Sequence, residues 1–250
     1  MSDFKVIHTT ADEYGDFCVL DDGDYRILAF GENDEQSKLD KQYPHIPQHT
    51  YVQAMLAALL FVKPKSVIIL GLGGGALVHA FKHYDAAIKM TAVEVRQQVI
   101  DVARRYFQLP VGKKLQLIHQ DAYPFVVEAE HKKVDLLCAD IYSEKGVDQR
   151  QLSDSFMQGC KSKLKQQGML VLNCWKEHSR DLAFQQRLSQ HFNYVYACLT
   201  AGGNWVIFAC DHDAGFSQAN NKAATQALSQ QLDFNIQRVL TRFESWKYEA

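Results

Sequence analysis

The feature that most restricts the fold is a regular alternation of short apolar runs and amphipathic segments between Lys65 and Cys210. Runs such as KSVIILG (65–71) and KMTAVEV (89–95) are rich in β-branched residues and predict buried strands. The segments between them carry apolar residues at helical spacing. This alternation predicts a mainly parallel sheet with helices on both faces. Further strands are expected in KLQLIHQD, KVDLLCAD, GMLVLNCW and the two runs around Ala201-Gly202-Gly203-Asn204.

The two ends of the chain depart from this rhythm. Residues 1–48 are predicted to form an N-terminal β-hairpin unit and a linker, because FCVLDDGDYRILAF has two apolar runs split by a turn and a polar stretch with two prolines follows. Residues 49–250 are predicted to form one Rossmann-like nucleoside-binding catalytic domain. Its last two strands form a hairpin, so the last strand should be antiparallel. Apolar spacing over 217–246 predicts a long final helix, docked on its own domain or on a second subunit.

Charge and composition limit the partners. The chain has 250 residues, of which 47% are hydrophobic and 22% charged, and a net charge of −2. No basic surplus is present for nucleic acid or for an anionic membrane surface. The longest apolar stretch, 54–62, is shorter than the roughly 20 residues of a membrane helix. The six cysteines lack CxxC spacing and are expected to be free thiols in a reducing compartment. We therefore expect a cytoplasmic protein acting on a small-molecule or peptidic acceptor.

A glycine-rich turn follows the first predicted parallel strand. Gly71, Gly73, Gly74 and Gly75 lie where a helix should begin. In open α/β sheets the ligand crevice lies at the carboxyl ends of the strands. Glycines there let a ligand approach the backbone and meet the helix N–H groups. Together with Ala76 the turn also satisfies a dinucleotide pattern, so an NAD-dependent oxidoreductase stays an alternative.

Acidic residues end the next three predicted strands. Glu94 is placed to accept hydrogen bonds from both ribose hydroxyls of a nucleoside. Asp121 is placed to accept from an adenine amino group, or to cap the following helix. Asp140 is placed to orient a nucleophile or to take its proton. A glycine turn followed by three acidic strand ends predicts a site for a nucleoside of the S-adenosylmethionine type.

At these residues the sequence resembles the spermidine synthase family, from about Val19 to Asp211. The motifs that carry the resemblance are GLGGGA (71–76), VEVR (93–96), QDAY (120–123) and DIYSEKG (140–146). The resemblance implies a Rossmann-like, seven-stranded class I methyltransferase fold with a small N-terminal β unit. The family is often dimeric, which makes a homodimer an expectation.

The resemblance also implies roles for individual residues. Glu94 would bind ribose, Asp121 with Ala122 would bind adenine, and Asp140 would take the proton of an attacking amine. Gln36 matches a family glutamine that touches the nucleoside. The implied co-substrate is S-adenosylmethionine or its decarboxylated form, and this sulfonium chemistry needs no metal.

Three motifs depart from those of the aminopropyltransferases. Position 74 is Gly where they have the Asp expected to hold the donor's ammonium, and Ser143 replaces an Asp that binds the diamine. Tyr51-Val52-Gln53 replaces the family's Tyr-His-Glu. Each lost charge-assisted hydrogen bond is worth roughly 1.5–3 kcal/mol, so two losses weaken diamine binding on the order of 100-fold or more. The sequence therefore favours methyl transfer, with aminopropyl transfer and a catalytically inactive nucleoside-binding module as alternatives.

The remaining predictions concern the acceptor and the histidines. Tyr51, Tyr142, Ser143 and Trp175 are predicted to contact the acceptor, with core packing as the alternative for Trp175. His79 and His83 lie four residues apart on one predicted helix, which is a metal-binding spacing. The sequence suggests no third ligand for them.

Overall fold

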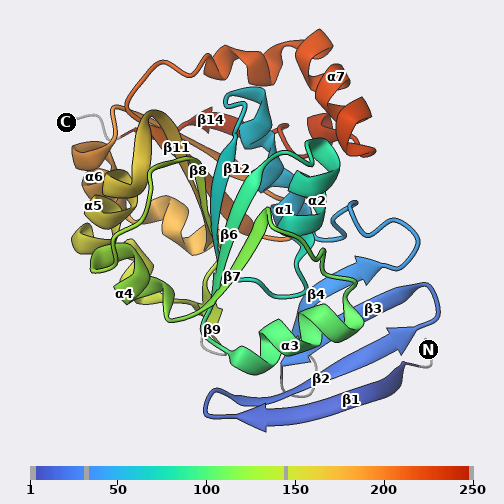
Figure 1. Cartoon of the computed structure of the whole chain (residues 1–250). Helices are drawn as coiled ribbons and strands as arrows, with labels where there is room; N and C mark the ends of the chain where they lie inside the picture. The colour runs from blue at the N-terminus through green and yellow to red at the C-terminus, as the bar shows by residue number, and fades with distance from the viewer. Residues whose placement is uncertain (1–3, 31–33, 144–145, 248–250) are drawn as a thin grey trace.

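The computed structural model describes residues 4–30, 34–143 and 146–247. The chain folds into a large, mostly parallel sheet with helices on both faces, and a smaller antiparallel sheet lies below one end of it (Figure 1). The predicted class I methyltransferase fold with its small N-terminal β unit is confirmed, but the large sheet has eight strands and not the predicted seven, because β14 is added at its edge.

The large sheet has eight strands in the order β14-β12-β13-β11-β8-β5-β6-β7. The strands β11, β8, β5, β6 and β7 run parallel to one another, whereas β13 is antiparallel to both β11 and β12. The predicted antiparallel strand from the final hairpin is therefore confirmed. The bounds are β5 (Ser66–Leu70), β6 (Lys89–Glu94), β7 (Leu115–His119), β8 (Val134–Ala139), β11 (Leu164–Trp175), β12 (Tyr194–Leu199), β13 (Asn204–Cys210) and β14 (Phe243–Ser245).

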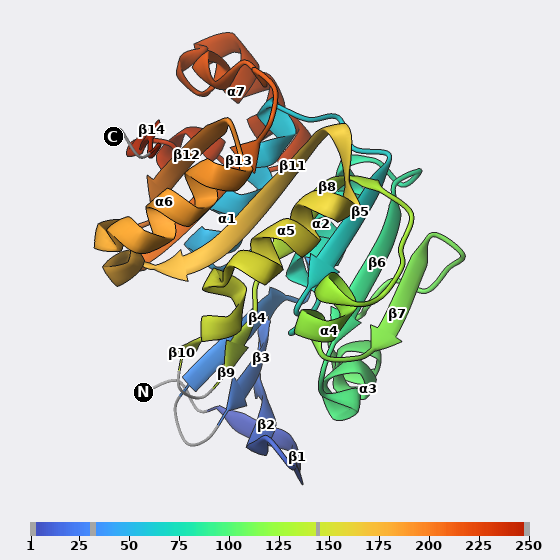
Figure 2. The same cartoon turned by 90° about the vertical axis from the view of Figure 1, so that its left-hand side faces the viewer.

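Apolar side chains fill both faces of this sheet because its strands have few polar residues to turn toward water. One core lies under α1, η1, α2 and α7, and the other lies under α4, α5 and α6 (Figure 2). The bounds are α1 (Thr50–Met55), η1 (Leu56–Leu60), α2 (Ala76–Tyr84), α3 (Gln97–Tyr106), α4 (Ala122–Val127), η2 (Gln149–Leu152), α5 (Asp154–Lys163), η3 (Lys176–Arg180), α6 (Leu182–His191), η4 (Phe216–Asn220), α7 (Lys222–Leu232) and η5 (Ile236–Arg238). A short hairpin, β9 (Tyr142–Ser143) and β10 (Gly146–Val147), follows β8.

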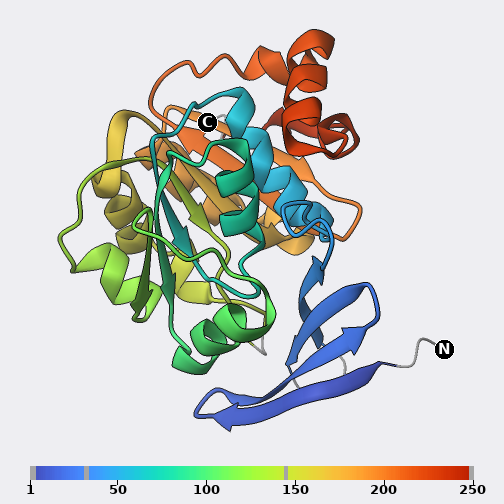
Figure 3. The same cartoon turned by 45° about the vertical axis from the view of Figure 1, so that its right-hand side comes forward.

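The N-terminal unit is a four-stranded antiparallel sheet of β1 (Lys5–Asp12), β2 (Gly15–Asp22), β3 (Tyr25–Phe30) and β4 (Asp34–Asp40). The prediction that 31–48 is a linker is wrong for 34–40. Three consecutive polar residues of this strand, Glu35, Gln36 and Ser37, border a cavity. A third apolar core joins the unit to α3, which lies against it in Figures 1 and 3.

The predicted long final helix is also wrong. Helix α7 ends at Leu232, and Asp233 follows it in the left-handed conformation with φ 58°. The chain then makes the short turn η5 and adds β14 to the edge of the large sheet. The apolar residues that suggested one helix still face the protein: Leu228, Leu232, Ile236, Val239 and Leu240 are buried. The spacing of these apolar residues indicates that they are buried, but it does not show that the helix continues past Asp233.

No helix in the described ranges is both long enough and apolar enough to span a lipid bilayer. All six cysteines are free, and every one except the partly exposed Cys18 is buried. The prediction of free thiols is confirmed.

Candidate functional site

The register of the parallel strands brings the predicted site residues together. Leu70 of β5 lies beside Val93 and beside Ala139, so the glycine turn, Glu94 and Asp140 leave the sheet at the same edge. A cavity of about 930 Å³ opens there, between this edge and β4. That volume suits a nucleoside together with a small second substrate. The predicted residues that line it are Gln36, Tyr51, Gly71, Gly73, Glu94, Asp121, Ala122, Asp140, Tyr142 and Trp175.

Two glycines of the turn are required by close contacts within the protein. Gly71 has φ 88°, and a Cβ there would lie 2.1 Å from the backbone oxygen of Asp140. Gly73 has φ 51°, and its Cβ would lie 2.6 Å from Ser37 Oγ. Both conformations and both contacts exclude a side chain. The turn therefore lies tightly between β8 and β4 with its peptide groups bordering the cavity.

Gly74 and Gly75, which were predicted to contact the donor, are not among the residues lining the cavity. The Gly74 N–H donates to Ser37 Oγ at 2.8 Å, and a Cβ would lie 2.8 Å from the Phe107 ring. At Gly75, the N-cap of α2, a Cβ would meet Leu109 at 2.4 Å. These two glycines allow the turn to pack against the segment after α3. The prediction that all four glycines of the turn admit a ligand is therefore corrected for Gly74 and Gly75.

Glu94 is a buried carboxylate that organises the turn. Its Oε2 accepts from the Leu72 N–H at 2.9 Å, and its Oε1 accepts from the Arg96 N–H at 3.0 Å. Burial raises the pKa of Glu94, while these backbone donors act in the opposite direction. Each carboxylate oxygen can accept two hydrogen bonds, so capacity remains for the predicted contact with ribose hydroxyls.

Asp140, the predicted proton acceptor, follows β8 and borders the cavity. Its Oδ1 accepts from Asn173 Nδ2 at 2.8 Å, and the Tyr51 hydroxyl donates a second hydrogen bond. Burial raises the pKa of Asp140 to about 6, because the desolvation outweighs these two donors. The group is ionised at pH 7 and can accept a proton, as a general base requires.

Aromatic rings border the cavity next to Asp140. The Tyr142 and Trp175 ring centroids are 6.2 Å apart, and Trp175 is 43% exposed. A Cβ at Gly146 would lie 2.3 Å from the Trp175 ring, so this glycine makes room for the indole. Trp175 thus lines the cavity rather than the core. Ser143 pairs with Gly146 through its backbone, and its predicted side-chain role falls outside the described residues.

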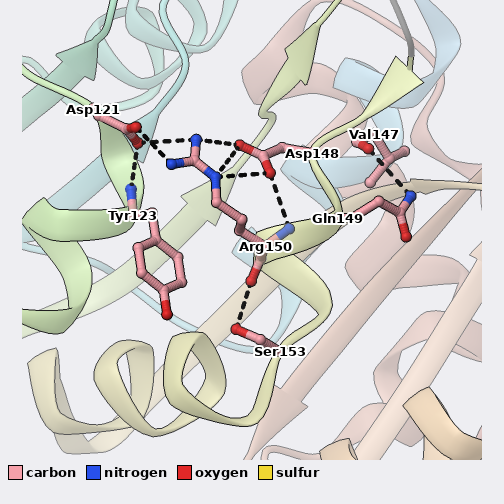
Figure 4. A network of polar contacts seen from close by, with 7 residues as sticks. All are labelled: Asp121, Tyr123, Val147, Asp148, Gln149, Arg150 and Ser153. Carbon is pink, nitrogen blue, oxygen red and sulfur yellow. Dashed lines mark hydrogen bonds and ion pairs between the residues drawn. The ribbon is translucent and has the colours of Figure 1, made fainter.

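Asp121 caps α4, as one of its two predicted roles required, by accepting from the Tyr123 N–H at 2.8 Å. Its carboxylate also binds Arg150, with 2.7 Å between Nη1 and Oδ2. Arg150 in turn pairs with Asp148 at 2.6 Å, so one guanidinium bridges two carboxylates (Figure 4). An adenine amino group at Asp121 would share this carboxylate with Arg150.

Several residues at the site were not predicted. Asn173 lies at the end of β11, beside β8, where the parallel order places it next to Asp140. Glu35 and Ser37 come from β4, which was taken for a linker, and Arg150 comes from η2. A signal existed for Asn173, because it is a polar residue in an otherwise apolar strand. No comparable signal marks the others, since charged residues in polar segments are ordinarily solvated.

The described lining of the cavity is strongly acidic. Six carboxylates border it, from Glu13, Glu35, Glu94, Asp121, Asp140 and Asp148. Two arginines also border it, and both are paired: Arg150 as above, and Arg96 with Asp12 at 2.7 Å. Burial lowers the pKa of His49, which leaves this imidazole neutral at pH 7. The lining therefore favours a cationic ligand.

Comparison with known proteins identifies the family. The model of the spermine/spermidine synthase domain matches residues 44–229. A polyamine aminopropyltransferase from Chromobacterium violaceum is 28% identical over 219 residues, which cover 86% of this chain and 81% of that protein. The polyamine aminopropyltransferase from Neisseria meningitidis serogroup A is 28% identical over 177 residues, covering 70% of this chain and 67% of that protein.

Solved structures share the fold at lower identity. A probable spermidine synthase from Corynebacterium glutamicum has a TM-score of 0.79 at 16% identity, covering 96% of this chain and 91% of that one. A spermidine synthase in complex with the transition-state analogue AdoDATO has a TM-score of 0.68 at 17% identity, with coverages of 92% and 88%. Human methyltransferase-like protein 13, in complex with SAH, has a TM-score of 0.63 at 21% identity, with coverages of 74% and 93%.

The family model covers most of the chain, and the glycine turn, Glu94, Asp121 and Asp140 all fall inside the matched range and lie at one edge of the sheet. The chain is a transferase that belongs to the spermine/spermidine synthase domain family.

Proposed function

We propose that the protein transfers an aminopropyl group from decarboxylated S-adenosylmethionine to an amine. The observation that carries the proposal is the acidic lining, in which six carboxylates border the cavity and both bordering arginines are paired. The donor's sulfonium and ammonium groups and the amine acceptor are all cationic. The names of the relatives, polyamine aminopropyltransferases, support the same activity.

The choice of donor follows from charge. Intact S-adenosylmethionine carries a carboxylate on its tail, whereas the decarboxylated form does not. Within the described lining, an added carboxylate would meet acidic groups and no unpaired arginine or lysine. Like charges in a partly desolvated cavity repel strongly. This repulsion favours the decarboxylated donor, although the sequence by itself favoured methyl transfer.

The chemistry requires alignment and one proton acceptor. The acceptor nitrogen attacks the propyl carbon bonded to sulfur, the carbon–sulfur bond breaks, and its electron pair stays on sulfur, giving 5′-methylthioadenosine. The nitrogen then loses a proton to Asp140, held by Asn173 and Tyr51. Tyr142 and Trp175 border the space for the acceptor. Positioning the two reactants accounts for most of the acceleration in such a step.

Methyl transfer is the second candidate, and one observation favours it. Position 74 has neither a carboxylate nor room for one, because a Cβ would lie 2.8 Å from Phe107 and 3.0 Å from Ser37 Cβ. The donor's ammonium would therefore have to be held by another group. In methyl transfer the sulfonium methyl group goes to the acceptor, and S-adenosylhomocysteine is the other product.

The test is to incubate the protein with each sulfonium donor and a panel of diamines and polyamines, and to identify the nucleoside product by mass spectrometry. We expect 5′-methylthioadenosine from the decarboxylated donor. S-adenosylhomocysteine from the intact donor would overturn this proposal in favour of methyl transfer. Binding of both product nucleosides without turnover would indicate an inactive binding module. Asp140→Asn is the control for background reaction.

A further inference from the structure

We infer that His45, His83 and Asp233 form a binding site for a divalent transition-metal ion of the Zn²⁺ type. The three residues lie in segments far apart in sequence, namely the connector after β4, the last turn of α2 and the residue after α7. None of them lines the cavity described above. The site is therefore separate from the transfer chemistry, and the inference does not rest on the proposed function.

The donor atoms converge on one point. Asp233 Oδ2 lies 3.0 Å from His45 Nε2 and 3.2 Å from His83 Nε2, and the three atoms lie within 4.8 Å of one another. At metal–ligand distances of about 2.0–2.1 Å, two ligands of a tetrahedral zinc ion are roughly 3.3 Å apart. Two of the three separations already match this spacing, and a turn of one imidazole ring would direct all three atoms at one ion, with water in the remaining position.

The donor set suits this class of metal. Two imidazole nitrogens and one carboxylate oxygen are borderline ligands that bind Zn²⁺, Co²⁺ and Ni²⁺ better than Mg²⁺ or Ca²⁺, which prefer oxygen. His79, which lies four residues before His83, is not available as a ligand, because it is buried and its Nε2 lies 2.8 Å from the Phe107 carbonyl oxygen. The fold instead brings His45 and Asp233 to His83, although the sequence suggests no third ligand.

The two imidazoles are held face to face, with ring centroids 3.8 Å apart and planes 18° apart. For both lone pairs to point at one ion, one ring must turn. His83 has the room to do so, since its side chain is 36% exposed while that of His45 is 18% exposed.

A metal here would fasten three parts of the chain. The connector that carries His45 leads from the N-terminal sheet into the catalytic domain, and α2 packs against α7 (Figure 3). Asp233 is one of two described non-glycine residues with positive φ. The fold accepts that conformation where α7 ends, and it places the carboxylate between the two histidines. A ligand that binds the folded chain in this way raises its stability.

The test is to strip the full-length protein with a chelator, to titrate it with Zn²⁺ by calorimetry, and to titrate it with Co²⁺ by absorbance. We expect one ion per chain and a visible Co²⁺ d–d absorption band that is absent from the metal-free protein. At 100 times its dissociation constant, Zn²⁺ should raise the melting temperature by about 5–10 °C.

Three variants and one matched control decide the assignment. His45→Ala, His83→Ala and Asp233→Asn should each weaken Zn²⁺ binding by more than about tenfold. Asn is well tolerated at positive φ, so Asp233→Asn keeps the turn intact. His191→Ala removes a different His–Asp pair, with 2.7 Å between Nε2 and Asp154 Oδ1, and should leave binding unchanged. No binding by the unaltered protein, or binding that survives all three variants, would overturn the inference.

Discussion

Asn173 Nδ2 donates a hydrogen bond of 2.8 Å to Asp140 Oδ1, across the boundary between β11 and β8. The bond favours the ionised form of a carboxylate that burial otherwise drives toward the protonated form. Burial is the largest influence on the pKa of Asp140, and Asn173 and Tyr51 oppose it. The pH dependence of the reaction should follow from this pair of residues.

The rate should rise with pH and level off. Because the pKa of Asp140 is raised to about 6, the group is protonated and inactive as a base below that pH. We expect kcat at saturating acceptor to increase about tenfold per pH unit below 6 and to become constant above about 7. The measurement is kcat between pH 5 and 9. A rate that is independent of pH below 6 would show that Asp140 is not the base.

Asn173→Ala should move this profile to higher pH. A hydrogen bond to a charged group is worth about 1.5–3 kcal/mol, and each 1.36 kcal/mol corresponds to about one pKa unit. We expect the midpoint of the rise to shift upward by roughly one unit, with the plateau rate largely restored at high pH. Tyr51→Phe, which removes the other donor, should shift it in the same direction. A loss of rate without a shift would point to a role in binding.

Asp140→Asn should strongly reduce activity and stabilise the fold at pH 8. The folded-state pKa of about 6 lies above the ordinary value of 3.8 for an aspartate. The contribution of Asp140 to stability is therefore greatest below pH 3.8 and is lost as pH rises through 6. Removing the ionisable group should raise the free energy of unfolding by about 1–3 kcal/mol at pH 8, and kcat should fall about 10²–10⁴-fold. Urea unfolding at pH 4 and at pH 8 is the measurement, with no gain expected at pH 4.

Asp121 can be tested for its two roles separately. Asp121→Asn keeps a good N-cap and should leave stability within about 0.5 kcal/mol, whereas Asp121→Ala should lose about 1 kcal/mol. If the carboxylate also binds adenine, both variants should bind 5′-methylthioadenosine about tenfold more weakly. Calorimetry and thermal melts measure the two effects. Unchanged affinity in both variants would leave capping and the pairing with Arg150 as the roles of Asp121.

Introducing the family's aspartate at position 74 should destabilise the protein. In Gly74→Asp the new Cβ would meet Phe107 at 2.8 Å and Ser37 Cβ at 3.0 Å. Overpacking of this kind typically costs about 1–3 kcal/mol, and we expect urea unfolding to show that loss. Gly74→Ala should show most of it, since the clash is at Cβ. A stable Gly74→Asp protein with a faster aminopropyl transfer would mean that the turn can widen.

Much of the fold could be predicted because its signals are local. Buried β-branched strands alternate with amphipathic helices, and the ends of β5, β6, β7 and β8 carry the residues that the resemblance singles out. The sequence therefore predicts Glu94 and Asp140 as residues that border the site. The order of parallel strands then follows from the fold, but the side-chain contacts do not.

What could not be predicted depends on contacts between distant segments. Strand β4 is polar where it borders the cavity. A polar segment of this kind is predicted from its sequence to be a linker. The break after α7 depends on one left-handed residue, Asp233, that carries no strong sequence mark. The crowding around Gly74 involves Ser37 and Phe107, which are 37 and 33 residues away in the chain.

The hydrogen bond that the Gly74 N–H donates to Ser37 Oγ ties the glycine turn to the N-terminal sheet. It is reinforced by Arg96, which spans from the end of β6 to Asp12 and to the Gly15 carbonyl oxygen. The N-terminal sheet is thereby held to the large sheet at two separate points next to the cavity. These contacts hold the N-terminal sheet in one orientation. We therefore expect the relative orientation of the two sheets to differ little between the free and the ligand-bound protein.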